Sequence, residues 1–137
     1  RKNLEGIEYV HVTTHGIDDK YIYENIRDKR VIRKLILENQ ESFEINIIAY
    51  CIMNNHLHLL LKFKKPENLS KYMHKVNTSY AIYYNKNHKK HADLSMSFGY
   101  DTFVIDHKTY LEDCIRVTDK KMYEEKNRKK ALAKAQN

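Results

Sequence analysis

The chain has 137 residues, of which 42% are hydrophobic, and this size fits a single globular domain over residues 1–137 with a modest core. Its formal net charge is +7, which favours a polyanion such as nucleic acid as a partner. With only three glycines and one proline, the sequence has no Gly-rich phosphate loop, which disfavours nucleotide hydrolysis. No apolar run approaches the length of a membrane span, about 18 residues, so we expect no membrane partner and a cytoplasmic location.

The first half of the chain alternates strand and helix signals. A β-branched stretch that ends at Gly16 predicts a strand at 7–14. Asn25 is a typical helix-capping residue, and the apolar spacing after it predicts a helix that runs to about Gln40. Residues 45–53 are apolar on both alternating faces, which predicts a central strand covered on both sides.

Two histidines follow this strand in a second apolar run. Asn54 and Asn55 favour a tight turn into a strand at 56–63. The side chains that should point to the core are Leu57, Leu59, Leu61 and Phe63. His56 and His58 should then share the other face, because side chains at i and i+2 of a strand point the same way. Two imidazoles on one face can bind one divalent cation.

The second half repeats the alternation. Helical spacing predicts a helix at 68–87, a strand follows at 100–105, and a further helix begins near Asp106. Cys51 and Cys114 lie in apolar patterns far apart in sequence, so we expect buried free thiols. The order β-α-β-β-α-β-α predicts an α+β protein with a ferredoxin-like antiparallel sheet and an additional C-terminal helix.

The stretch 49–61, Ala-Tyr-Cys-Ile-Met-Asn-Asn-His-Leu-His-Leu-Leu-Leu, resembles the HUH motif (His, hydrophobic residue, His) of single-strand DNA transposases with one catalytic tyrosine, especially their REP-associated branch. Residues 9–16 are similar to the first strand of that family, 68–85 to its second helix and 110–116 to the start of its catalytic helix. The resemblance covers residues 9–116 in the right order.

The resemblance implies a reaction. In such proteins the tyrosine hydroxyl attacks a DNA phosphate, forms a 5′-phosphotyrosine link and releases a 3′-OH, without ATP. A divalent metal, Mg²⁺ or Mn²⁺, held by His56 and His58 would polarise a phosphate oxygen. The implied partner is single-stranded or hairpin DNA, and both monomers and homodimers occur in the family.

The sequence differs from the family pattern at the position of the nucleophilic tyrosine. Val117 stands where the tyrosine is usual, directly after Cys-Ile-Arg. Tyr123 and Asn127 reproduce the family's tyrosine-plus-four spacing, and a helix would put them on one face with Arg116 and Lys120. We therefore expect Tyr123 as the nucleophile and Asn127 as a further metal ligand. A different tyrosine, chiefly Tyr100, and a catalytically inactive chain remain as alternatives.

Basic and aromatic residues supply candidate DNA contacts, through phosphates and stacked bases respectively. The expected set is His11, His15, Lys71, Lys75, Tyr80, Arg116 and Lys120. The alternative function is an inactive DNA- or RNA-hairpin binder derived from such a transposase. An RNA-recognition module is a weaker third choice, because its aromatic stacking motif is absent from the sequence.

Overall fold

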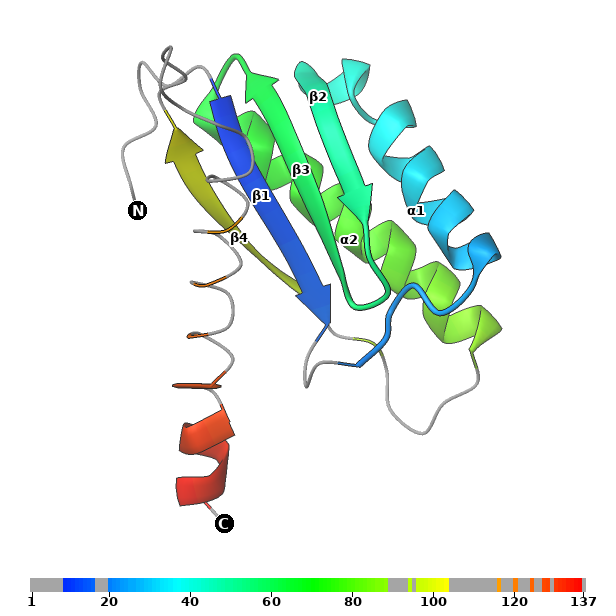
Figure 1. The fold of residues 1–137 in the computed structure, drawn as a ribbon. Coiled ribbons are helices and arrows are strands. Elements are labelled where there is room, and N and C mark those ends of the chain that lie inside the picture. Colours follow the sequence, from blue (N-terminus) through cyan, green and yellow to red (C-terminus); the bar gives the residue numbers. More distant parts are fainter. Residues whose placement is uncertain are drawn as a thin grey trace.

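The computed structural model describes residues 9–16, 20–88, 94, 96–103, 116, 120, 124, 127–128 and 130–136 (Figure 1). Its elements are β1 (Tyr9–Gly16), α1 (Ile26–Glu38), the short 3-10 helix η2 (Glu41–Phe43), β2 (Ile45–Ile52), β3 (His56–Phe63), α2 (Pro66–Asn87) and β4 (Met96–Phe103). Helical backbone follows at 116, 120, 124, 127–128 and 130–135. No helix among these residues is long and apolar enough to cross a membrane.

The four strands form one antiparallel sheet in the order β2-β3-β1-β4. β1 and β2 flank α1 in the chain, yet β3 lies between them in the sheet, which is the split arrangement of a ferredoxin-like fold. The predicted α+β fold and its additional C-terminal helix are therefore confirmed. Figure 1 shows β3 and β1 at the centre of the sheet.

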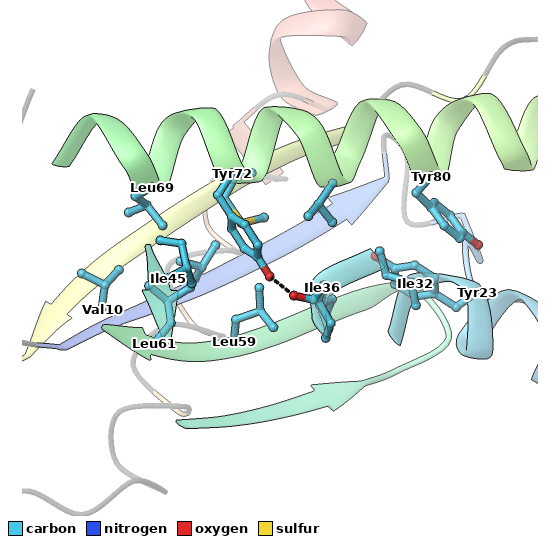
Figure 2. Packing of buried hydrophobic residues seen from close by; sticks show 14 of the residues in the cluster. Val10, Tyr23, Ile32, Ile36, Ile45, Leu59, Leu61, Leu69, Tyr72 and Tyr80 are labelled. Carbon is cyan, nitrogen blue, oxygen red and sulfur yellow. Dashed lines mark hydrogen bonds between the residues drawn. The ribbon is translucent and has the colours of Figure 1, made fainter. Parts of the chain in front are cut away.

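The core lies between one face of the sheet and the two long helices. Alternate residues of β1 and β3 point into it, and α1 and α2 supply the other wall (Figure 2). The fully buried side chains include Val10, Val12, Leu57, Leu59, Leu61, Ile32, Ile36, Met73 and Val76. Burying each large apolar side chain stabilises the fold by about 1.5–3 kcal/mol. Tyr72 of α2 also donates a hydrogen bond of 2.7 Å to the carbonyl of Ile36 in α1.

The prediction of a central strand at 45–53 was wrong. β2 is an edge strand, and its register with β3 shifts between Ile47 and Ala49, so that Ile48 forms a bulge. Ile48 is 48% exposed, and Cys51 is exposed as well. The expectation of a buried thiol was therefore wrong for Cys51, while Cys114 lies outside the described residues.

Other boundaries shift by a few residues. β4 begins at Met96, four positions before the predicted strand, and α2 begins at Pro66. Proline is favoured in the first turn of a helix because its missing N–H has no helical partner there. The predicted start of the C-terminal helix, near Asp106, lies outside the described residues.

A polar cluster joins the start of α1 to the end of α2. Asn25 caps α1 by accepting a 2.9 Å hydrogen bond from the Asp28 backbone, as predicted. The buried Asp28 carboxylate accepts from the hydroxyl of Tyr83 at 2.8 Å and lies 2.9 Å from Nε2 of His88. The pKa of Tyr83 is raised, first by burial and then by its hydrogen bond to Asp28. The cluster holds the two helix ends together beside the loop that follows Lys20.

Candidate metal site on the histidine face

The sheet face opposite α1 and α2 carries a group of histidines, which we call the histidine face: His11 and His15 of β1 with His56 and His58 of β3. In the register of these strands, Thr13 lies opposite His58 and His15 lies opposite His56. Directly opposed residues of an antiparallel pair have neighbouring side chains on one face. The sheet therefore brings two histidines from each strand together.

His58 lies at the centre of this group. Its Nδ1 is 3.0 Å from Nε2 of His11 and 3.4 Å from Oγ1 of Thr13. The ring centroids of His11 and His58 lie 5.1 Å apart, with an interplanar angle of 25°. His58 is thus oriented from β1 through its Nδ1 atom.

His56 is oriented by its neighbour in the hairpin turn. Its Nδ1 lies 2.6 Å from Oδ1 of Asn55. Because a carbonyl oxygen can only accept, His56 donates from Nδ1, and the neutral ring then has its lone pair on Nε2. The His56 and His58 rings meet edge to face at 4.7 Å between centroids, which confirms that the two histidines share a face.

The turn before His56 is fixed by backbone contacts from a distant loop. The carbonyl of Asn54 accepts hydrogen bonds from the backbone N–H groups of Ile22 at 2.9 Å and Tyr23 at 3.0 Å. Within the hairpin, Met53 N–H donates to the carbonyl of His56 at 2.9 Å. These bonds confirm the predicted tight turn at Asn54 and Asn55 and hold the start of β3 in place.

Burial overturns two predicted DNA contacts. His11 is 2% exposed and His15 is 8% exposed, so neither is the surface phosphate contact that we expected. They belong instead to the histidine group. The alternation His11, Thr13, His15 along one strand indicates that the three share a face, but their proximity to His58 depends on the β1–β3 register, which the sequence does not show.

The pair His56 and His58 fits a divalent metal in the chemistry of its donors. Both rings project to one face, and a protein group lies against Nδ1 of each, which is how metal-binding imidazoles are commonly oriented. Within the described part of the chain, no group of three or more His, Cys, Asp or Glu residues has the geometry of a metal site. The two histidines would thus be joined by other ligands, such as phosphate oxygens, water or a residue outside the described ranges.

The remaining predicted site residues lie in several places. Asn127, Arg116 and Lys120 are helical and exposed, and Tyr123 lies outside the described residues. Tyr100 pairs with Val12 in the β1–β4 register, but its side chain is outside the described part of the structure.

The predicted contacts on α2 divide between surface and core. Lys71 and Lys75 are exposed, but α2 covers the sheet face opposite the histidines, so the fold does not bring these lysines to the histidine face. Tyr80 has no exposed surface, and its hydroxyl donates to the carbonyl of Ile22. The prediction that Tyr80 contacts DNA was therefore wrong.

Comparison with known proteins decides the family. The model of IS200-like transposases matches residues 6–113. This chain belongs to the IS200-like transposase family. A comparison with curated proteins gives no match. This match confirms the expected membership in a family of transposases.

Two solved structures share the fold. One is a REP-associated tyrosine transposase bound to a REP hairpin, at a TM-score of 0.59 and 9% identity, and the match covers 77% of this chain but 62% of that one. The other is a Deinococcus radiodurans R1 protein provisionally assigned as a transposase, at a TM-score of 0.56 and 8% identity, covering 92% of this chain and 97% of that one. At identities of 9% and 8%, the likeness shows only that these two proteins have the same fold as this chain.

Proposed function

We propose that this IS200-like protein is a metal-dependent single-strand DNA endonuclease and strand transferase that acts at hairpin-containing sites. The observation that carries the proposal is the pairing of His56 and His58, with rings 4.7 Å apart and with Nδ1 of His56 tied to Asn55. Together with the family match over residues 6–113, this pair supports phosphodiester chemistry.

In the proposed reaction a tyrosine oxygen attacks a DNA phosphorus as the tyrosine loses its proton. The bond from phosphorus to the 3′ oxygen breaks, and that oxygen takes up a proton to become a free 3′-OH. One phosphoester bond forms for each one that breaks, so the step requires no ATP and can be reversed by the 3′-OH. Mg²⁺ or Mn²⁺, when bound at His56 and His58, would offset the negative charge that develops on the phosphate oxygens.

Tyr123 is our proposed nucleophile and Asn127 our proposed additional ligand. The backbone is helical at Arg116, Lys120 and Asn127, and all three side chains are exposed. The sequence spacing of Tyr123 relative to these three residues is the one that a continuous helix, with about 3.6 residues per turn, would put on one face. An exposed face of this composition can meet DNA or the sheet of a second subunit in a homodimer.

Hairpin DNA is the proposed partner for two reasons. The net charge of +7 attracts a polyanion, and the REP-associated transposase that shares this fold is bound to a REP hairpin. A basic protein of this kind should bind a hairpin with an unpaired flank more tightly than the same sequence as a continuous duplex.

A second function is favoured by one specific observation, the presence of Val117 at the usual tyrosine register. A protein without the nucleophile would retain the fold and could bind hairpins without cutting them. The two functions differ in whether a covalent protein–DNA link can form.

Covalent capture tests the proposal. Labelled single-stranded DNA with a hairpin is incubated with the protein and Mn²⁺, and the products are separated under denaturing conditions. We expect a covalent adduct in the wild type and in Tyr100→Phe, and none in Tyr123→Phe. An adduct that persists in Tyr123→Phe would remove that tyrosine as the nucleophile. Tight hairpin binding without any adduct would identify the protein as a binder.

A further inference from the structure

We propose that His11 is a positioning residue for the metal site, because it sets which ring nitrogen of His58 carries the proton. This inference rests on the metal role proposed above for His58. The contact that carries it is the 3.0 Å separation between Nε2 of His11 and Nδ1 of His58. Both residues of this contact are buried, so the surrounding protein holds the two rings in place.

A hydrogen bond between two imidazole nitrogens needs one donor and one acceptor. If His11 donates, Nδ1 of His58 is the acceptor, and the ring proton of neutral His58 lies on Nε2, which then has no lone pair for a metal. If His58 donates, its Nδ1 carries the proton and its Nε2 carries the lone pair. Only the second arrangement makes Nε2 of His58 a metal ligand, and it requires His11 to accept.

The surroundings are compatible with the second arrangement. The Thr13 hydroxyl oxygen lies 3.4 Å from the same Nδ1 atom, and a hydroxyl can accept a hydrogen bond from His58 as well as donate one to it. His56 shows the same orientation, because Asn55 accepts from its Nδ1. Both histidines would then carry the proton on Nδ1 and the lone pair on Nε2.

The strand register explains why the contact is maintained. Thr13 lies directly opposite His58 in the β1–β3 ladder, and His11 lies two residues further along the same face. The planes of the His11 and His58 rings are inclined by 25°. A rotation of His58 about its side chain would move Nδ1 away from His11 and break the hydrogen bond.

Three variants distinguish the effect of the accepting nitrogen of His11 from the effect of its aromatic ring. His11→Phe keeps an aromatic ring against His58 but removes the acceptor. His11→Gln places an amide oxygen near the position of Nε2 and should rescue the function. His74→Phe is the matched control, because His74 is exposed on α2, which covers the other face of the sheet.

Calorimetric titration of Mn²⁺ into the full chain gives the first readout. We expect His11→Phe to weaken binding about 10- to 100-fold, as is typical when the partner of a metal-binding histidine is lost. His11→Gln and His74→Phe should bind as the wild type does. Wild-type affinity in His11→Phe would overturn the proposal. Unchanged affinity in His56→Ala/His58→Ala would instead overturn the metal site itself.

The ¹⁵N NMR spectrum of the His58 ring in the metal-free protein gives the second readout, which needs no metal and no activity. The proposal predicts a protonated Nδ1 and an unprotonated Nε2 in the wild type and in His11→Gln. A protonated Nε2 in the wild type would contradict it. Because this measurement is made on the wild type, it tests the proposal even when His11→Phe does not fold.

Discussion

The hydroxyl of Tyr80 in α2 donates a hydrogen bond to the backbone carbonyl of Ile22. The N–H of Ile22 in turn donates to the carbonyl of Asn54 at the tip of the β2–β3 hairpin. The buried face of α2 is thereby connected to the turn that precedes His56, although α2 and the histidines lie on opposite sides of the sheet.

Replacement of Tyr80 by Phe should lower the free energy of unfolding by about 1–3 kcal/mol, because the carbonyl of Ile22 would remain buried without its donor. Urea unfolding followed by circular dichroism measures this loss. Tyr21→Phe is the control, since the Tyr21 side chain is 60% exposed and should cost little. Equal stability of the two variants would show that the bond to Ile22 is not important for the fold.

The two histidines of the proposed metal site should differ in their effect on stability. His58 is 6% exposed and bonded to His11, so His58→Ala leaves a buried partner behind and should cost about 1–3 kcal/mol. His56 is only partly buried, and His56→Ala should cost less. Chemical unfolding of both variants without metal measures the two losses of stability. A larger loss in His56→Ala than in His58→Ala would contradict the structure.

Three core tyrosines should resist ionisation. Burial raises the pKa of Tyr23, Tyr72 and Tyr80 above the ordinary value of 10.0. In the unfolded chain these groups lose their protons near pH 10, so their contribution to stability is complete below that pH and declines as the pH rises above it. Ultraviolet absorbance during an alkaline titration should show these tyrosines ionising only as the protein unfolds. Ionisation of all tyrosines in a still folded protein would contradict their burial.

DNA binding should depend steeply on salt, because lysine contacts to phosphates release counterions. Arg116 and Lys120 are exposed and are proposed to meet DNA, so each replacement by Ala should reduce the slope of log affinity against log salt by about 1. Lys34→Ala, which removes one partner of an exposed pair with Glu38, is the control on α1. Fluorescence anisotropy with a flanked hairpin and a matched duplex supplies the affinities. Equal affinity for both DNAs would count against hairpin recognition.

Local periodicity was sufficient to predict the order of elements and the shared face of His56 and His58. The spacing of two residues in a strand places both imidazoles on one side, whatever the neighbouring strands are. The same reasoning indicated that Leu57, Leu59 and Leu61 face the core, and all three are fully buried.

Features that depend on tertiary structure were not predictable in this way. β2 contains no charged residue, as is common in a central strand. The order of the strands nevertheless puts β2 at the edge of the sheet, and a bulge at Ile48 interrupts the alternation of its side chains. The proximity of His11 to His58 follows from a pairing of strands 47 positions apart in sequence. Tyr80 follows Met73 and Val76 at helical spacing, which is typical of a residue on the buried face of a helix.

The most direct test of the account measures the yield of covalent protein–DNA adduct as Mn²⁺ is added, in the wild type and in His56→Ala/His58→Ala. The account predicts an adduct that increases with Mn²⁺ in the wild type, disappears with a chelator and is absent from the double variant at every metal concentration. An equal yield in the double variant, or a wild-type yield that a chelator does not change, would contradict the proposal that these two histidines hold the metal for strand transfer.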